Sequence, residues 1–427
     1  NDVLFFRDGR PMEGAASGHG AAWPLPHVIN AAFHAALHRA FPEDQAGEHK
    51  HRLVVNHQAD DSKRIKRFGS LITVGPFPVK LDEKGQQQWF FPRPADADEK
   101  GMTSVTLKPV VATKTNFPCS NSLPSPLLYP MGNTLPAAKD EHGEPWINRE
   151  SYQSYLQNES HPGGFLNDTD IFDVEHQIGI AIDPATQTAE EGRFYSAEYL
   201  RLRDGFALGV LSAMSGESVD LVPLMIQKNS TMIVGGQQRA CSVKIESVKT
   251  LPLPLGRRAF ECCKGKYRVK WVLLTPAIWP EIMADDSRGI QGHSGGWLPN
   301  WVTADGKVAL RDGMGVRKAE RLHHEAGKPI EARLVAALVP KPVVVTGWAL
   351  GDQAGDTPGG AKSTQLAVPA GAVYYFEANS PEHATALADA LNWHGKTEAT
   401  SIVNRRSTLC GEKGFGYGLC GTWEGIG

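Results

Sequence analysis

The sequence has no long apolar run. None of its 427 residues lies in a stretch of about 18 apolar residues, the length that a helix needs to cross a bilayer. Its first residues, NDVLFFRDGR, lack the basic leader and apolar core of a signal peptide. We therefore expect a cytoplasmic protein with no membrane partner.

An excess of charge of either sign is also missing. The chain carries 44 Lys and Arg residues against 47 Asp and Glu, a net charge of -3. This balance excludes a bulk polycation, so any nucleic acid must be bound by local basic patches. The composition, 41% hydrophobic and 21% charged, is globular, and the length indicates two domains or one elaborated domain.

Metal-binding and disulfide patterns are absent too. The six cysteines form no CxxC pair, and Cys262 and Cys263 are adjacent, which suits neither a common zinc site nor a mutual disulfide. His34 and His38 lie four residues apart but lack the glutamate of HExxH and a third ligand. We expect reduced thiols, no metal site and no cofactor.

Glycine is concentrated in the tail GEKGFGYGLCGTW, residues 411–423. A P-loop is excluded because no Lys-Ser or Lys-Thr follows the glycines. A dinucleotide-binding loop is disfavoured because the tail leads into an apparent strand and not into a helix. Two interpretations stay open. The tail is either a turn that lets the last strand enter a sheet, or a bare backbone surface that a polynucleotide can approach closely.

Hydrophobic spacing predicts helices and strands along the chain. Residues 27–41 follow two prolines and repeat apolar side chains at helical spacing. Residues 380–395 predict a second helix, with Ser380 as N-cap and Gly395 beyond its end. A short helix is predicted within 146–157, and strands are predicted within 68–94, 175–214, 266–279, 331–350, 363–377 and 418–425.

The order of these elements predicts the fold. The second half reads as strand, intervening segment, strand, strand, helix and strand, and the first half reads the same way with larger insertions. This is the order of a ferredoxin-like unit. We predict an α+β protein of two tandem ferredoxin-like (RRM-like βαββαβ) domains, residues 1–250 and 251–427, with an irregular insertion at about 93–145.

Nine segments in a fixed order carry a resemblance to a known family. They are DVLFFRDGRP, WPLP, IGIAIDPATQTAEEGRFYSAEYLRL, GGQQR, VLLTPAIW, GWLPNW, VTGWAL, AVPAGAVYYFE and GFGYGLCGTW. Together they resemble the third-subunit family of the Cmr complex. That complex is the type III-B CRISPR RNA-guided effector, and the family belongs to the repeat-associated mysterious protein (RAMP) superfamily. The resemblance runs from residue 2 to 423, with a gap at about 93–145.

The resemblance implies a ribonucleoprotein subunit in antiviral defence. Such a subunit holds the 5′ handle of CRISPR RNA, lies between the large palm-domain subunit and the first backbone subunit, and meets target RNA only indirectly. It also implies that no catalytic residues are present. Some members of the superfamily cleave RNA, so the alternative is a CRISPR-RNA processing endoribonuclease with His19, His27 or His34 as general base.

Local basic runs and glycine clusters supply the candidate RNA-binding residues. Cations that neutralise phosphates give a salt-dependent affinity, glycines permit close approach, and an aromatic ring offers a stacking face. For each single basic run, a solvated surface is the alternative. The candidates are Arg7, Arg10, Lys63, Arg64, Lys66, Arg67, Arg201, Arg203, Gly235, Gly236, Gln237, Arg239, Lys264, Lys266, Arg268, Lys413, Gly414, Phe415, Gly416 and Gly418.

Overall fold

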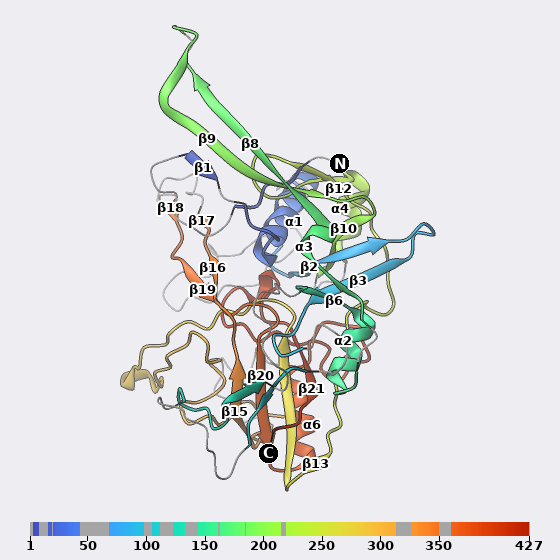
Figure 1. Cartoon of the computed structure of the whole chain (residues 1–427), viewed down its shortest axis with the longest axis vertical. Helices are drawn as coiled ribbons and strands as arrows, with labels where there is room; N and C mark the ends of the chain where they lie inside the picture. Colours follow the sequence, from blue (N-terminus) through green and yellow to red (C-terminus); the bar gives the residue numbers. More distant parts are fainter. Residues whose placement is uncertain are drawn as a thin grey trace. The chain divides into compact units, whose positions relative to one another are not determined.

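Antiparallel strands dominate the computed structural model of the chain, which has more strand than helix (Figure 1). The structure describes residues 3–7, 16–18, 20–42, 68–97, 105–111, 123–133, 144–160, 163–183, 185–214, 219–312, 327–349 and 360–426. Among these, no helix has the length and apolar character to span a membrane. The mixed content of strand and helix agrees with the α+β class that the sequence predicts.

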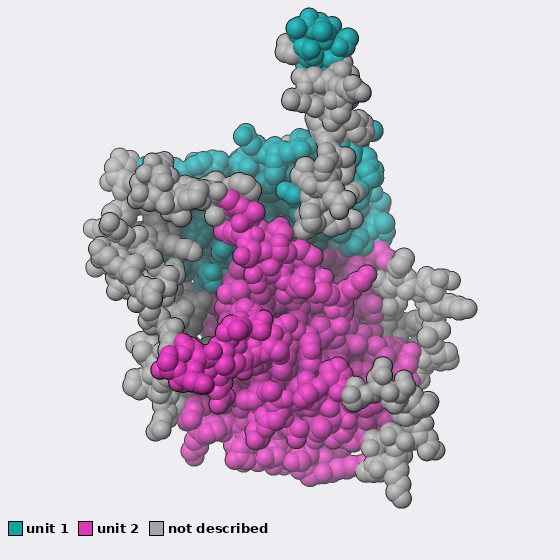
Figure 2. All heavy atoms as spheres, turned by 90° about the vertical axis from the view of Figure 1, so that its left-hand side faces the viewer, with its two compact units in different colours: residues 1–87, 168–248, 412–414 teal, residues 88–167, 249–411, 415–427 magenta. Residues whose placement is uncertain are grey.

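The chain forms two compact units, each built from separate stretches of sequence (Figure 2). Unit 1 contains residues 1–87, 168–248 and 412–414, and unit 2 contains residues 88–167, 249–411 and 415–427. The change at 248–249 lies close to the expected boundary at 250. Residues 88–167 were expected in the N-terminal domain but belong to unit 2, where their polar side chains bond to its main sheet.

Unit 1 joins a long ribbon to a helix-covered strand pair. Its elements are β1 (Ala16–Gly18), α1 (Pro26–Ala40), β2 (Leu71–Leu81), α3 (Asp168–Ile171), β8 (Phe172–Ile182), β9 (Ala189–Leu202), β10 (Phe206–Met214), α4 (Leu221–Lys228), β11 (Thr231–Ile233) and β12 (Ala240–Ser242). The antiparallel pairs are β8 with β9, β2 with β10 and β11 with β12. Helix α1 packs on β2 and buries Ile29, Phe33 and Leu37, as its helical spacing predicts.

Unit 2 contains the main sheet. Its elements are β3 (Gln87–Pro92, which begins at the boundary), β4 (Leu107–Pro109), β5 (Met131–Asn133), β6 (Trp146–Asn148), α2 (Arg149–Leu156), β7 (Phe165–Leu166), β13 (Cys262–Cys263), β14 (Lys266–Leu273), η2 (Asp286–Arg288), β15 (Ala332–Leu338), β16 (Val343–Val345), β17 (Trp348–Ala349), β18 (Gly360–Ala361), β19 (Gln365–Ala367), β20 (Val373–Ala378), α6 (Pro381–Leu391), η3 (Gly411–Lys413, which ends in unit 1) and β21 (Gly418–Thr422).

The main sheet has the strand order β21–β14–β20–β15, and every neighbouring pair is antiparallel. One face is apolar, with Val269 and Trp271 of β14 beside Tyr374 and Phe376 of β20, all buried. The rings of Trp271 and Tyr374 lie 5.9 Å apart. Burial of large aromatic side chains contributes strongly to a core, so this face anchors unit 2.

Helix α6 covers the sheet and confirms a predicted helix. The Ser380 hydroxyl accepts a hydrogen bond from the backbone N–H of His383 at 3.3 Å, which makes Ser380 the N-cap. Pro381 follows in the first turn, where a missing N–H is tolerated. At the other end, the Asn404 amide donates to the carbonyl of Asp389 at 2.7 Å, which satisfies a carbonyl in the last turn of the helix.

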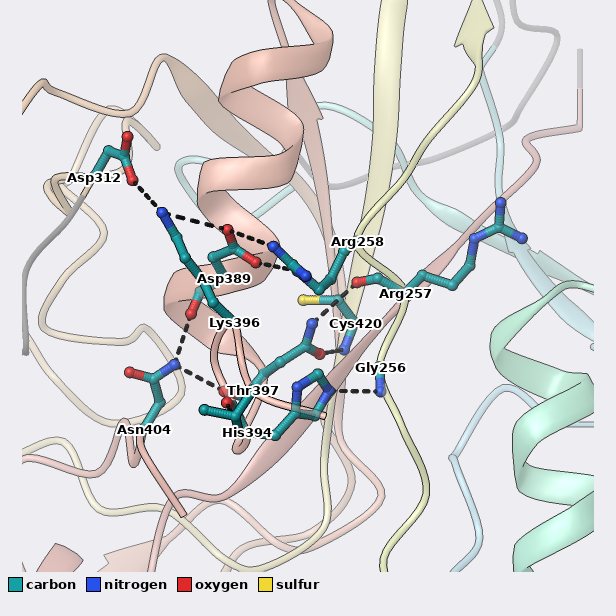
Figure 3. A network of polar contacts seen from close by, with 11 residues as sticks. Gly256, Arg257, Arg258, Asp312, Asp389, His394, Lys396, Thr397, Asn404 and Cys420 are labelled. Carbon is teal, nitrogen blue, oxygen red and sulfur yellow. Dashed lines mark hydrogen bonds and ion pairs between the residues drawn. The ribbon is translucent and has the colours of Figure 1, made fainter. Parts of the chain in front are cut away.

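Beyond α6, a polar network fastens residues 256–258 to the last strand (Figure 3). The Asn392 side chain accepts from the backbone N–H of Cys420 at 2.6 Å and donates to the carbonyl of Arg257 at 3.0 Å. The His394 Nε2 atom accepts from the N–H of Gly256 at 3.1 Å. Burial lowers the pKa of His394, so this side chain is held neutral and serves as an acceptor.

The other face of the main sheet is polar and is covered by residues from 88–167. The Asp96 carboxylate accepts from the Tyr155 hydroxyl at 2.6 Å and from the Tyr375 hydroxyl at 2.8 Å. The Lys270 ammonium lies 3.9 Å from Asp96 and 3.5 Å from the centre of the Tyr155 ring. Lys270 and Asp96 are each 1% exposed. Burial lowers the pKa of Lys270 to about 8, against the opposing attraction of Asp96.

Candidate nucleic-acid interface

Five of the predicted RNA-binding residues come together on unit 1. Residues 3–7 run antiparallel beside β9, and Leu4 exchanges two backbone hydrogen bonds of 2.8 Å with Leu200. The turn 235–238 between β11 and β12 docks on the same segment, because the N–H of Gly236 donates to the Phe5 carbonyl at 2.8 Å. The contact joins two segments that hold predicted residues: Arg7 lies in the segment 3–7, and Gly235, Gly236, Gln237 and Arg239 lie at the turn.

The two glycines of this turn serve the packing of the chain itself. A Cβ on Gly236 would lie 2.7 Å from the Phe5 ring, and a Cβ on Gly235 would overlap the Phe5 carbonyl oxygen. Gly235 also has φ +76°, a conformation in which an L side chain is strained. The glycines therefore let the turn approach residues 3–7, and this use differs from the predicted close approach of a polynucleotide.

Both glutamines of the turn have a left-handed backbone, with φ 56° at Gln237 and 55° at Gln238. A residue other than glycine in this region costs on the order of 1 kcal/mol. The turn is held in place by a hydrogen bond from the Tyr199 hydroxyl to the Gln237 side chain. The N–H of Val234 also donates to the Arg239 carbonyl at 2.9 Å. Both glutamines are exposed, so a strained turn presents amides to solvent.

The cations beside the turn differ in their surroundings. The Arg239 guanidinium lies 4.9 Å from the centre of the Tyr199 ring, an attractive cation–π arrangement. Arg7 is exposed. On the ribbon, Arg201 is paired with Glu175 and Arg203 with Asp173, so two of the predicted candidates have acidic partners across the strands. The Arg201 guanidinium lowers the pKa of Glu175 through this hydrogen bond.

Several basic residues of the run 257–270 form ion pairs or ring contacts within unit 2. Arg258 is paired with Asp389. Lys396 also points toward Asp389, as Figure 3 shows. Arg268 is 7% exposed, its guanidinium lies 4.5 Å from the centre of the Trp423 ring, and its Nε atom is 4.0 Å from Glu377. The expectation that Arg268 is a surface cation is therefore wrong.

Lys264 and Lys266 keep the exposure that the sequence predicts. They flank the turn between β13 and β14, with φ 50° at Lys264. The Lys266 ammonium donates to the Asn379 side chain at 2.8 Å. Of the three RNA-binding candidates in this basic run, only these two are exposed, and neither has a charged partner among the described residues.

The glycine-rich tail is buried, against the prediction of an accessible surface. A Cβ on Gly414 would lie 2.9 Å from both Pro26 and Thr73 of unit 1. In unit 2, a Cβ on Gly416 would overlap the backbone of Ser407, and one on Gly418 would overlap the Trp271 ring. Phe415 is 0% exposed and so offers no stacking face. The tail is the turn that lets the last strand enter the sheet, and of its candidates only Lys413 is partly exposed.

Five candidate cations and one candidate base fall outside the described residues. The cations are Arg10, Lys63, Arg64, Lys66 and Arg67, and the base is His19. The other two candidate bases, His27 and His34, lie on α1 and are half-buried.

Two features of unit 1 were not predicted from the sequence. Gln238 was not selected, although it is exposed like Gln237 and shares its left-handed turn. Alternating apolar residues are typical of a half-buried strand, yet those of β8 are exposed along the ribbon. Their exposed fractions are 52% for Val174, 70% for Ile178, 54% for Ile180 and 57% for Ile182. The alternation itself carries no signal that distinguishes a free ribbon from a packed one.

Metal binding and a small-molecule pocket receive no support in the part of the chain that the structure describes. No group of three or more His, Cys, Asp or Glu side chains there is arranged to hold a metal ion. A hollow of about 360 Å³ beside α6 is lined by Asp312, Glu382, Asp389 and Lys396. Three carboxylates against one ammonium disfavour a phosphate group.

Comparisons with known proteins found similar chains in solved structures and one matching family. The chain is similar to a chain in "Cryo-EM structure of the Type III-B Cmr-beta bound to cognate target RNA and AMPPnP, state 1", with 12% identity, a TM-score of 0.38, and coverage of 87% of this chain and 83% of that one. It is also similar to a chain in "Cryo-EM structure of the Type III-B Cmr-beta bound to cognate target RNA", with 13% identity, a TM-score of 0.37 and the same coverage. No curated protein sequence matches significantly.

The family model of the CRISPR-associated protein Cas_Cmr3 matches residues 1–423. Because this match spans nearly the whole chain, the protein belongs to the Cmr3 family, the third-subunit family of the type III-B CRISPR effector complex. The resemblance carried by the nine segments is therefore confirmed.

Proposed function

We propose that this chain is a non-catalytic subunit of a Cmr complex that holds the 5′ handle of CRISPR RNA at the turn 235–239 of unit 1. The observation that carries the proposal is the hydrogen bond from Gly236 to Phe5, which docks the turn on the segment 3–7 that includes Arg7. Two guanidinium groups, at Arg7 and Arg239, then belong to segments that are in contact. Guanidinium groups are well suited to phosphate because they donate two parallel hydrogen bonds.

The side chains of the turn favour binding over cleavage. Arginine stays charged at all relevant pH values, and a side-chain amide does not ionise near neutral pH. General acid–base cleavage of RNA needs a group that titrates in this range. The turn therefore has the chemistry of a retention site, and we assign chain cleavage to other subunits. The same subunit bridges the large palm-domain subunit to the first backbone subunit and meets target RNA indirectly.

The strand order supports a ferredoxin-like unit in unit 2. Numbered along the chain, its four main strands lie in the order fourth, first, third, second, with α6 between the third and fourth. Residues 274–331 take the place of the first helix. We infer that unit 1 is a second, more elaborated member of the same class.

The test is handle binding by a charge-reversed turn. Arg7→Glu together with Arg239→Glu is expected to weaken binding of a labelled 5′ handle RNA and to reduce the slope of log K against log salt by about two, because each lost phosphate contact removes about one. Lys307→Glu, an exposed cation of unit 2 paired with Asp305 at 2.9 Å, is the matched control. Equal slopes for all three proteins would refute the proposed site. RNA cleavage by the wild type in EDTA would refute the non-catalytic assignment.

A further inference from the structure

We infer that Gln238 reads the edge of an unpaired base of the RNA bound at the turn, beside the phosphate contacts of Arg7 and Arg239. This inference rests on the proposed function and deepens it. It assigns a base-reading residue where the proposal itself supplies only charge.

The backbone at Gln238 is fixed while its side chain is not. Its neighbours are tied down: Gln237 by the Tyr199 hydroxyl, Gly236 by the Phe5 carbonyl, and Arg239 by the backbone bond to Val234. The side chain of Gln238 is exposed and makes no hydrogen bond to any residue that the structure describes. A long polar side chain is thus held at a defined point with its amide open to a ligand.

Glutamine at position 238 destabilises the conformation of the turn relative to glycine. At φ 55°, glycine would avoid the strain of on the order of 1 kcal/mol that a side chain brings. Glycine is tolerated nearby, since positions 235 and 236 already carry it. A glutamine at this position is therefore unfavourable for the conformation and gains its value from what the side chain contacts.

The chemistry of the amide selects a base over a phosphate. Its carbonyl oxygen accepts and its NH₂ group donates, which matches the adjacent donor and acceptor on the edge of a base, as in the bidentate pairing with adenine. Single-stranded RNA exposes such edges. A phosphate has only acceptors and is met better by the two arginines. Gln238 would thus bind a base while Arg7 and Arg239 bind phosphates of the same RNA strand.

The experiment compares base discrimination in Cmr complexes reconstituted around the full chain, as wild type and as Gln238→Gly. The probe is a set of 5′ handle RNAs, each with one nucleotide replaced by the other three bases in turn. For wild type, we expect one handle position at which a wrong base lowers affinity by roughly 5-fold to 150-fold, the range for one good base contact. In Gln238→Gly, discrimination at that position should fall to within about twofold, with the salt slope unchanged.

Gln238→Gly relieves backbone strain, so a loss of folding is not expected, and its thermal unfolding midpoint should equal or exceed that of wild type. Gln187→Gly makes the same change at another exposed glutamine with a left-handed backbone, φ 57°, and should keep wild-type discrimination. If Gln238→Gly keeps the full base preference at every position, the inference is overturned while handle binding stands. If the wild-type complex does not bind the handle through this subunit, the proposed function falls as well.

Discussion

Replacing the buried Lys270 by Met should remove a distinctive pH dependence from the stability of unit 2. Lys270 is 1% exposed, and its ammonium is 3.9 Å from Asp96. Methionine keeps the length and flexibility of the side chain but carries no charge. The variant therefore reports the protein with the charge of Lys270 removed and the shape of its site nearly unchanged.

The sign of the effect follows from the lowered pKa. Burial lowers the pKa of Lys270 from 10.5 to about 8, so between these values the unfolded chain binds more protons than the folded one. Stability then rises with pH in this interval. At about 1.36 kcal/mol per pH unit, the interval limits the gain to about 3 kcal/mol. Most of it develops between about pH 7 and pH 10.

The assay is urea unfolding of wild type and Lys270→Met at several pH values, followed by tryptophan fluorescence. Burial raises the pKa values of Tyr155 and Tyr375, so stability falls above about pH 10 in both proteins, and the comparison stops there. From pH 7 to pH 10, the free energy of unfolding of the wild type should rise by about 2 kcal/mol or more relative to that of the variant. Parallel stability curves would show that Lys270 keeps an ordinary pKa and would contradict the lowering by burial.

The remaining predictions concern the glycines and the basic run of unit 2. Gly416→Ala should cost more than about 3 kcal/mol in urea unfolding, because φ is +80° and its Cβ overlaps the backbone of a neighbouring segment. Gly265→Ala should cost only about 1 kcal/mol, because φ is +76° with nothing within 4 Å; similar losses for both would contradict the packing of the tail. Lys264→Glu with Lys266→Glu should lower the salt slope of RNA binding, because both ammonium groups are exposed, whereas Arg268→Met should leave the slope unchanged because Arg268 is buried. A fall in slope for Arg268→Met would contradict its burial.

Local patterns predicted the individual elements well. Helix α6 begins with the predicted cap, because Ser380 bonds to the N–H of His383, a contact that depends only on neighbours in sequence. The strands β14 and β20 lie where their apolar alternation places them. The helix at Pro26–Ala40 follows the two prolines as expected. These features need no information from distant parts of the chain.

Features that depend on distant partners were not predictable. Lys266, Arg268 and Lys270 alternate along β14, which is the pattern of a solvated sheet face. The structure exposes the first and buries the other two, because Trp423 and Asp96 come from remote segments to cover them. The tail glycines likewise looked like a bare surface, and the atoms that fill the space beside Gly416 belong to Ser407.

The convergence at the unit 1 turn was only half predicted. Arg7 and the GGQQR segment were selected separately, one as a basic flank and the other as a glycine cluster. The contact between their segments, made by Phe5 and Gly236, appears only in the fold. Gln238 was not selected although its neighbour Gln237 was, because the left-handed backbone that distinguishes this turn is not visible in the sequence.

The most direct test is photo-crosslinking of the handle RNA to this subunit within the assembled Cmr complex, with the crosslinked peptides mapped to single residues. The account predicts crosslinks from handle nucleotides to residues 5–7 and 235–239 of unit 1. Handle crosslinks confined to unit 2, with none at either segment, would contradict it.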